Sequence, residues 1–396
     1  MARGTMDDRP HVMHLYSRLD VGGIEWILMR LLPRLNAGRY RTSVCLLKRP
    51  GELAERLRAE GVEVHFVPIK GRMRPTTLVT LSRFFRREKV SIVHAHSRVS
   101  MASATLAARL ARVPVVLGTV HTLNSTAGRR RALQERLLDK WRDAVVTVSE
   151  RVREQYCSAT GTGRDKCITI YHGIDLADFS PVAGDEARHE IRTRLGLGPE
   201  GPVVITVGRL ARYKAHEILI AAAPEVIAAV PGVRFLVVGG GERLDELEAM
   251  TAQAGVDGRF RFLGNRSDLP DLYCAADIFC LTSSYEGFSI AIVEALASGI
   301  PVVATDVGGN REAVQEGVSG FLVQEGDSRA VARRLIEVLA DPTLRARMSA
   351  AARERAARFS LEQTARATEA LYDRLLAARG PRHAGEDRRR QPLTRP

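Results

Sequence analysis

Two glutamates eight residues apart, Glu286 and Glu294, stand on either side of a short loop in the segment "SYEGFSIAIVEALASG". The apolar run before the loop, "IFCLTS", is typical of a buried strand, and the second glutamate falls inside an apolar helix pattern. A carboxylate has two acceptor oxygens that match neighbouring hydroxyls. The spacing therefore suits a ligand with a sugar at one end and a ribose at the other, although the pair taken alone favours a structural role. The alternative is structural: Glu286 caps the helix and Glu294 pairs with a surface arginine.

Groups suited to a diphosphate stand near this loop or at the ends of other strands. The predicted helix start directs the backbone amides of Phe288, Ser289 and Ile290 toward an anion, because a helix N-terminus has free N–H groups and a positive dipole end. Arg209 and Lys214, in "VGRLARYKAH", follow a strand and could neutralise a diphosphate without a metal. The alternative for these two cations is a pair of solvated loop charges.

Paired glycines mark two turns where a ligand could approach the backbone closely. Gly22 and Gly23, in "DVGGIEW", follow the first strand, where a backbone without side chains can pass beside a phosphate. The segment "TDVGGNREAV" repeats the arrangement with Gly308 and Gly309, followed by Glu312. The segment "VVGGGERL" has a leucine where a dinucleotide fingerprint needs its third glycine, so we expect no nicotinamide cofactor.

Histidines offer a metal-site hypothesis that the sequence favours less. His94 and His96 alternate on one predicted strand, "SIVHAHS", so both imidazoles could face one metal ion. No nearby Cys or Asp completes a closed site. We therefore favour a structural role for this pair and expect neither a metal nor a cofactor.

The elements that must position these residues form a repeated α/β pattern. Short β-branched runs alternate with longer amphipathic segments, which is typical of parallel sheets covered by helices on both faces. The pattern occurs twice. The predicted strands are "HVMHLYS", "TSVCLL", "VEVHFVP", "SIVHAHS", "VPVVLGTVH", "AVVTVS" and "CITIYHG" in the first half, and "PVVITVG", "RFLVVGG", "FRFLG", "IFCLTS", "PVVATD" and "GFLV" in the second.

We therefore predict two doubly wound, Rossmann-like domains that face each other across a cleft, where the ligand binds. Residues 1–180 would form the first domain and residues 201–359 the second, with a linker at 181–200. A periodic helix at 360–379 is expected to cross back to the first domain. The polar tail, 380–396, is expected to be disordered.

Charge is distributed unevenly along the chain. Residues 1–180 contain 31 Lys and Arg against 17 Asp and Glu, a net of +14, whereas the remaining residues carry a net of −1. The basic half could face an anionic membrane surface, which would be a peripheral contact, or could reflect solvated arginines. A scarcity of aromatic residues and the lack of a recognisable motif argue against nucleic acid.

Composition indicates a globular protein of the cytoplasm. The 396 residues exceed what one core usually serves, and 45% of them are hydrophobic. The apolar stretches are interrupted well before the ~18 residues of a membrane span. The N-terminus lacks the apolar core of a signal peptide, and the five cysteines suit reduced thiols. We expect a cytoplasmic protein that could lie peripherally at the inner face of the membrane.

Taken together, the motifs resemble those of glycosyltransferase family 4, whose members have the GT-B fold. The similarity runs from "GGIEWILMRLL" through "GTVH", "HGIDLADFSP" and "VGRLARYKAH" to "EGFSIAIVEALASGIPVVATDVGG". Its most specific element is the E-x7-E motif formed by Glu286 and Glu294. The resemblance implies a retaining glycosyltransferase that uses a nucleoside-diphosphate sugar and no catalytic metal. It also implies that residues 1–180 form the acceptor-binding domain and residues 201–359 the nucleotide-sugar-binding domain.

The resemblance also implies roles for individual residues. Glu286 would contact hydroxyls of the donor sugar, His121 would lie near its 6-hydroxyl, and Glu294 would hold the ribose. The donor diphosphate would bind to a set of cations and backbone groups: Arg209, Lys214, Gly23, Phe288, Ser289 and Ile290. Supporting positions around the site would be Gly22, His172 and Glu312.

Three departures from the family pattern bear on donor choice. His172 stands where an asparagine is usual, Ala215 where a glycine follows the lysine, and Asn310 and Arg311 lie between the second glycine pair and Glu312. The acceptor stays open between an envelope or lipid-linked glycan and a small natural product. The alternatives to a transferase are a GT-B nucleotide-sugar epimerase and a non-catalytic relative that binds a nucleotide sugar.

Overall fold

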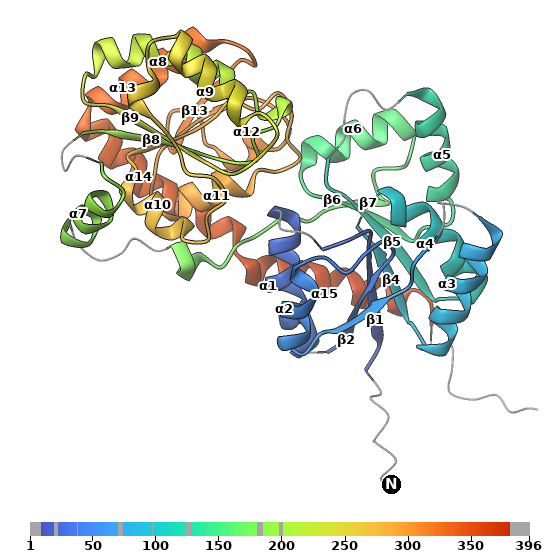
Figure 1. The fold of residues 1–396 in the computed structure, drawn as a ribbon. Coiled ribbons are helices and arrows are strands. Elements are labelled where there is room, and N and C mark those ends of the chain that lie inside the picture. Colours follow the sequence, from blue (N-terminus) through green and yellow to red (C-terminus); the bar gives the residue numbers. More distant parts are fainter. Residues whose placement is uncertain are drawn as a thin grey trace, which may run out of the picture.

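The computed structural model describes residues 9–19, 23–37, 39–69, 74–96, 98–122, 128–179, 185–197 and 201–380. These residues form two α/β domains, each built on one parallel sheet with helices on both faces (Figure 1). We call the part with the seven-stranded sheet domain 1 and the part with the six-stranded sheet domain 2. Each strand overlaps one of the runs predicted from the sequence, and both sheets are doubly wound, as expected.

The sheet of domain 1 has the order β3-β2-β1-β4-β5-β6-β7, and its neighbouring strands are parallel. The order reverses between β1 and β4, so the carboxyl ends of these two strands are the expected place for a ligand. The strands are β1 (His11–Tyr16), β2 (Arg41–Leu46), β3 (Glu63–Phe66), β4 (Ile92–Ala95), β5 (Val115–Val120), β6 (Ala144–Thr147) and β7 (Cys167–Thr169).

The sheet of domain 2 has the order β10-β9-β8-β11-β12-β13, again with parallel neighbours. Its order reverses between β8 and β11, which places the equivalent ligand position beyond those strands. The strands are β8 (Val203–Val207), β9 (Arg234–Val238), β10 (Phe260–Phe262), β11 (Ile278–Leu281), β12 (Val302–Thr305) and β13 (Gly320–Val323).

Helices cover both faces of each sheet (Figure 1). Those of domain 1 are α1 (Gly23–Ala37), α2 (Leu53–Ala59), α3 (Pro75–Arg87), α4 (Arg98–Ala111), α5 (Arg129–Asp139) and α6 (Glu150–Thr160). The later helices are α7 (Asp185–Arg194), α8 (His216–Ala229), α9 (Leu244–Gln253), α10 (Leu269–Ala275), α11 (Ile290–Ala297), α12 (Asn310–Ala313), α13 (Ser328–Ala340), α14 (Pro342–Ala356) and α15 (Leu361–Ala377). Short 3-10 helices are η1 (Leu176–Phe179), η2 (Arg212–Lys214), η3 (Asp257–Arg259) and η4 (Ala357–Phe359).

The last helix, α15, lies against domain 1 although it follows domain 2 in the sequence. It packs beside α1 (Figure 1), and the hydroxyl of Tyr372 lies 2.6 Å from Nδ1 of His94 on β4. Ser360 caps the helix by accepting a bond from the amide of Gln363 at 3.2 Å. The tail at 381–396 lies outside the described residues.

The helix inside the predicted linker, α7, packs against α10 of domain 2. Arg188 and Arg192 each lie 2.7 Å from a carboxylate oxygen of Asp277, the residue before β11. The same carboxylate accepts a bond from the amide of Val203, the first residue of β8. These contacts tie α7 to the sheet of domain 2.

Strand composition explains the two cores. The central strands are rich in Val, Ile, Leu and Ala with almost every side chain buried, as expected when helices cover both faces of a parallel sheet, whereas the edge strand β3 has no buried side chain. The five cysteines form no disulfide. Among the described helices, none combines the length and the apolar character that crossing a membrane requires.

Candidate active site

Lys214 and Glu286 meet at the point where the strand order of domain 2 reverses. Lys214 ends η2 after β8, and Glu286 lies in the loop after β11. Lys214 Nζ lies 2.6 Å from Glu286 Oε1, and both side chains are nearly buried. The hydroxyl of Ser283 donates to the same oxygen at 2.7 Å. Burial lowers the pKa of Lys214, but the carboxylate of Glu286 outweighs it and the net shift is upward, so the lysine is charged.

Three further contacts fix the two loops that carry this pair. The hydroxyl of Thr282 donates to the carbonyl of Ala215 at 2.9 Å, and the amide of Ser284 donates to the carbonyl of Tyr213 at 2.8 Å. The rings of Tyr213 and Tyr285 stack with centroids 4.9 Å apart, so Tyr285 packs against the loop that carries Lys214. The lysine and the glutamate are therefore held together by backbone as well as by charge.

Ala215, where the family resemblance implied a glycine, adopts a left-handed backbone conformation. Its φ is +47° and its ψ is +43°, and it separates η2 from α8. An L-residue with a Cβ takes this conformation at a cost of roughly 1–2 kcal/mol. The turn therefore keeps the shape that a glycine would allow, and Lys214 still reaches Glu286.

The second glycine pair packs against the loop of Glu286. Gly308 has a φ of +52°, and a Cβ added to it would lie 1.9 Å from the carbonyl oxygen of Glu286. The amide of Gly309 donates to the carbonyl of Gly287 at 3.0 Å. Glycine is therefore required here because one backbone passes directly over another.

The helix after this loop starts later than the sequence suggested. Ser289 is the N-cap and α11 begins at Ile290, so of the three residues predicted to supply amides only Ile290 lies in the helix. Phe288 precedes the cap, and its buried ring lies 5.3 Å from Tyr171 and 5.1 Å from Phe359, between ring centroids. The apolar ring of Phe288 is therefore buried instead of facing the ligand position. The N-terminus of α11 still lies within a few residues of Glu286.

Glu294 lies inside α11 in an apolar setting. Its Oε2 accepts a hydrogen bond of 2.9 Å from the hydroxyl of Tyr273 on α10. Burial raises the pKa of Glu294 to about 7, although the tyrosine bond works in the opposite direction. No side chain caps α11, so Glu286 does not cap it, and among the described contacts Glu294 has no arginine partner. The geometry therefore differs from the structural alternative.

Domain 1 reaches the same loop through backbone contacts. A Cβ added to Gly287 would lie 1.7 Å from the carbonyl oxygen of His121, the residue after β5. The hydroxyl of Ser149, the N-cap of α6, donates to the carbonyl of Gly287 at 2.8 Å. Glu286 and His121, which are 165 positions apart in the sequence, thereby become neighbours through Gly287.

His121 pairs with His172, the residue that departs from the family pattern. Nδ1 of His121 lies 3.1 Å from Nε2 of His172, and the rings are stacked. Burial lowers the pKa of His121 well below its usual value and that of His172 to about 4. Both rings are therefore neutral near pH 7, and the bond requires that one of the two facing nitrogens carries a proton and the other does not.

His14, His94 and His96 form a buried cluster at the strand-order reversal of domain 1. Their ligand nitrogens lie within 4.8 Å of one another, and within the described ranges this is the group able to surround a metal ion. Nδ1 of His14 lies 2.9 Å from Nε2 of His96, while both nitrogens of His94 are bonded to the hydroxyls of Tyr372 and Thr119. We interpret the cluster as neutral hydrogen-bonded imidazoles, since burial lowers the pKa of all three histidines.

Glu312 connects the two domains. Its carboxylate accepts bonds from the amides of Glu150 and Arg151 at 2.7 and 2.8 Å and from the hydroxyl of Tyr171 at 2.8 Å. Glu150 and Arg151 are the first residues of α6, so a side chain of domain 2 caps a helix of domain 1.

The remaining predicted residues are Arg209, Gly23 and Gly22. Arg209 is exposed on the loop after β8, and that loop is fixed by bonds from the amides of Gly208 and Leu210 to β9 and the residues after it. Gly23 opens α1, beyond the carboxyl end of β1. Gly22 lies outside the described residues.

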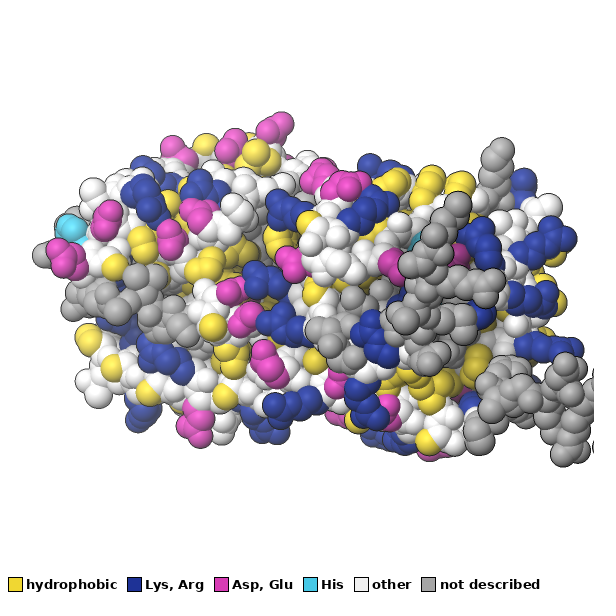
Figure 2. Space-filling view, turned by 90° about the horizontal axis from the view of Figure 1, so that it is seen from below, with side chains coloured by type: hydrophobic (Ala, Val, Ile, Leu, Met, Phe, Trp, Pro, Cys, Tyr) yellow, Lys and Arg dark blue, Asp and Glu magenta, His cyan; other side chains and the backbone are white. Residues whose placement is uncertain are grey.

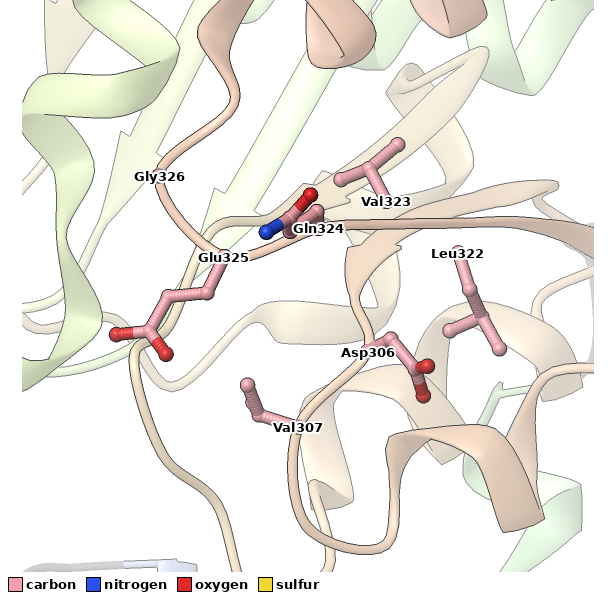
Figure 3. Close-up of a pocket in the computed structure, with 7 residues that line it drawn as sticks. All are labelled: Asp306, Val307, Leu322, Val323, Gln324, Glu325 and Gly326. Atoms are coloured by element: carbon pink, nitrogen blue, oxygen red, sulfur yellow. The ribbon is translucent and has the colours of Figure 1, made fainter.

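A cavity of about 590 Å³ lies beside the second glycine pair (Figure 3). It is formed by the loop after β12 and the loop after β13, and neither Lys214 nor Glu286 lines it. Its lining residues are Asp306, Val307, Leu322, Val323, Gln324, Glu325 and Gly326.

Four side chains that support the site were not singled out from the sequence. Ser149, Tyr171, Tyr273 and Ser283 each donate a hydrogen bond to a predicted residue or its neighbour. Only Ser283 carries a local signal, because it lies three residues before Glu286. The other three act across elements that sequence spacing does not relate.

Comparison with known proteins agrees with this arrangement. Residues 21–178 match the model described as Glycosyltransferase Family 4, and residues 187–355 match the model described as Glycosyl transferases group 1. The D-inositol 3-phosphate glycosyltransferase of Salinispora arenicola is 35% identical over 314 residues, which are 73% of this chain and 70% of that protein. The protein of the same name from Mycolicibacterium smegmatis is 35% identical over 315 residues, or 74% and 70%.

Solved structures confirm the predicted GT-B fold. The crystal structure of HepE from Anabaena in complex with UDP has a TM-score of 0.83 at 23% sequence identity, covering 92% of this chain and all of that one. The same protein in complex with UDP-glucose has a TM-score of 0.80 at 23% identity, covering 92% and 99%.

Proposed function

Because the chain belongs to glycosyltransferase family 4, we propose that it transfers a sugar from a nucleoside-diphosphate sugar to an acceptor hydroxyl, with retention of configuration and without a metal. The observation that carries this proposal is the contact between Lys214 and Glu286 at the strand-order reversal of domain 2. A donor of this class offers each of the two residues a replacement partner. Its diphosphate would pair with Lys214, and its sugar hydroxyls would donate to Glu286.

The diphosphate end would be held by fixed positive groups. Arg209 and Lys214 supply two cations from one loop, and the start of α11 adds the free amides and positive dipole end of a helix N-terminus. Gly23, at the start of α1, lets the backbone of domain 1 approach the phosphates. Negative charge that develops on the departing diphosphate is stabilised by these groups, which need no metal ion.

The sugar and ribose ends would be held by the two glutamates. Glu286 would accept hydrogen bonds from sugar hydroxyls, and neutral His121, whose carbonyl contacts Gly287, would lie near the 6-hydroxyl. Glu294 accepts bonds from the ribose. A ribose with two hydroxyl donors favours the ionised carboxylate, so donor binding would take a proton off Glu294 near neutral pH.

Retention is assigned to front-face attack. The bond between the anomeric carbon and the phosphate oxygen breaks, the acceptor oxygen bonds to the same face of that carbon, and the acceptor proton moves to the leaving phosphate oxygen. A double displacement would instead need a carboxylate nucleophile against the anomeric carbon, as in retaining glycosidases.

A phosphorylated hydroxyl compound is the acceptor class that we propose, either free or as part of a lipid. Domain 1 is strongly basic, and the curated relatives are named for D-inositol 3-phosphate. The comparisons do not favour an epimerase. The donor to test first is a UDP-sugar, since HepE was crystallised with UDP and UDP-glucose.

The test is a thermal-shift screen of the purified protein against UDP-, GDP-, ADP- and dTDP-sugars in EDTA, followed by detection of slow donor hydrolysis. Arg209→Ala should abolish the shift, whereas Arg212→Ala, which removes another exposed arginine of the same loop, should retain it. Hits are then assayed with D-inositol 3-phosphate in solution and with phosphatidylinositol in vesicles, which separates free from lipid-borne acceptors.

Metal-independent hydrolysis of one donor, with transfer to either acceptor, supports the proposal. Conversion of the donor into an isomeric nucleotide sugar would establish an epimerase instead. A folded protein that none of the donors stabilises would indicate a non-catalytic relative.

A further inference from the structure

We propose that one side of domain 1, centred on α5, binds an anionic membrane surface. The α5 surface is defined by Leu110, Leu133, Leu137 and Trp141 together with the exposed basic residues Arg112, Arg130, Arg136 and Lys140. The proposal concerns where the protein works and can be tested without any donor or acceptor.

Exposed apolar side chains are concentrated on this surface. Leu133 and Leu137 are 56% and 53% exposed and stand one helical turn apart, and Trp141, four residues further on, is 51% exposed. Leu110, at the end of α4, is 50% exposed, and α4 packs against α5. Four of the seven exposed large hydrophobic side chains among the described residues thus lie here, which marks an interaction surface.

The carboxylates on these elements face inward, where they pair with buried or partly buried arginines. Glu135 and Asp139 both pair with the buried Arg142, at 2.8 and 2.7 Å, and Asp143 pairs with Arg109 at 2.7 Å. The three carboxylates are 13%, 4% and 9% exposed. Among the described side chains of α5 and its C-cap, the exposed charged ones are Arg130, Arg136 and Lys140, and this set of cations fits an anionic partner.

The first turn of α5 carries three consecutive arginines and no acidic residue. Cations at this position are disfavoured by the positive end of the helix dipole and by each other. An anionic surface facing this turn would offset this repulsion.

Lipid fits this combination better than the alternatives do. A helix with leucines and a tryptophan flanked by Lys and Arg is the pattern of an interfacial segment, with the apolar side chains in the acyl boundary and the bases among the headgroups. The basic character continues over the end of domain 1 where α3 and α4 lie, and Figure 2 shows dark blue side chains predominating at that right-hand end.

A fluorescence experiment tests whether Trp141 contacts the membrane. The chain has two tryptophans, so Trp26→Phe leaves Trp141 as the sole reporter. Adding vesicles of phosphatidylcholine with 30% phosphatidylglycerol should shift its emission to the blue, and vesicles of phosphatidylcholine alone should not. Vesicle cosedimentation of the full chain, with its salt dependence, gives the affinity.

Matched variants test the two components separately. Leu133→Gln/Leu137→Gln and Arg130→Glu/Arg136→Glu/Lys140→Glu should each weaken vesicle binding at least ~10-fold, since each basic residue near an anionic surface contributes substantially. The control Arg329→Glu/Arg333→Glu/Arg347→Glu makes the same charge change on exposed residues of domain 2 and should bind nearly as the parent does, as should Val318→Gln.

Three results would overturn the proposal. The first is no cosedimentation with anionic vesicles, and the second is cosedimentation without a Trp141 shift, which would move the contact elsewhere. The third is a dimer in sedimentation analysis that the α5 variants dissociate, because the surface would then bind a second copy. A variant that loses vesicle binding while keeping its hydrolysis of donor in solution would separate this inference from the proposed reaction.

Discussion

At the residue scale, the charges proposed to contact the donor have partners that imitate parts of it. Glu286 accepts from an ammonium and a serine hydroxyl, and Glu294 accepts from a tyrosine hydroxyl. These partners keep buried charges and polar groups satisfied, which a folded protein requires. Binding a donor therefore exchanges one set of hydrogen bonds for another, and removing a partner affects stability as well as activity.

Glu286→Ala should lower turnover by at least ~10²-fold, because the hydroxyls of the donor sugar lose the carboxylate that accepts their hydrogen bonds. Added azide should not restore activity, since front-face attack has no carboxylate whose place azide could take. The measurement is the rate of donor consumption with and without azide, alongside circular dichroism to confirm folding. Rescue by azide with an inverted product would favour a covalent intermediate.

Glu294→Gln should separate stability from binding. The pKa of Glu294 is about 7 in the folded protein against 4.5 for an ordinary glutamate, so the folded state holds a proton that the unfolded state releases. Stability of the parent is therefore expected to fall as pH rises from about 4.5 to 7, by on the order of 1–3 kcal/mol. The variant should lack this loss and melt higher than the parent at pH 8.

The affinity for the donor should change with pH in the opposite direction to stability. The parent should bind more tightly as the pH passes 7 and Glu294 ionises, and the variant should bind weakly at every pH. Calorimetric titrations at pH 6, 7 and 8 check both expectations. Equal melting temperatures for the two proteins across this range would contradict the raised pKa.

At the element scale, short turns carry the site because they follow the central strands. The turn after β8 places Lys214, and the turn after β11 places Glu286 and the start of α11. The glycines of the turn after β12 pack against the turn that carries Glu286. One turn departs from the ideal: Ala215 takes the left-handed conformation that glycine adopts without cost.

Ala215→Gly should therefore stabilise the protein. The relief of the left-handed conformation, roughly 1–2 kcal/mol, exceeds the entropy that a glycine adds to the unfolded chain, so a net gain of about 0.5–1 kcal/mol is expected. Thermal or urea unfolding measures it. Ala254→Gly, at the C-cap of α9 with ordinary dihedral angles, is the control and should destabilise instead. A loss of stability in Ala215→Gly would show that the turn is not strained.

At the scale of the whole molecule, domain 1 and domain 2 meet through the loop that carries Glu286. Gly287 contacts the carbonyl of His121 and the hydroxyl of Ser149, while Glu312 caps α6 from the other domain. If His121 and Glu286 both contact the donor as proposed, activity would depend on how closely the domains approach, because the two residues belong to different domains.

Gly287→Ala should test this dependence. Its Cβ would lie 1.7 Å from the carbonyl oxygen of His121, so the backbones must separate. We expect activity to fall at least ~10-fold and stability to fall by about 1–3 kcal/mol, with a larger radius of gyration in solution scattering. Gly258→Ala, at a position with nothing within 4 Å, is the control and should be neutral. Unchanged activity in Gly287→Ala would mean that this contact does not serve the reaction.

The sequence alone determined the features that have a local signal. Strand runs, the two sheets, and the loop and helix around Glu286 and Glu294 follow from short-range patterns of β-branched, polar and glycine residues. The charge asymmetry of the chain is also a property of sequence. The start of α11 differed from the predicted start at Ser289 by one residue, and the burial of Phe288 between Tyr171 and Phe359 depends on contacts that the local pattern does not contain.

Only the tertiary structure decided which distant residues meet. Lys214 faces Glu286, His121 faces His172 and Gly287, and Glu312 reaches the start of α6 because parallel strands bring the ends of separate segments to one edge. The raised pKa of Glu294 and the inward turn of the α5 carboxylates depend on burial, which is set by packing of elements far apart in sequence. Local pattern fixes what each segment is, and packing fixes what its side chains touch.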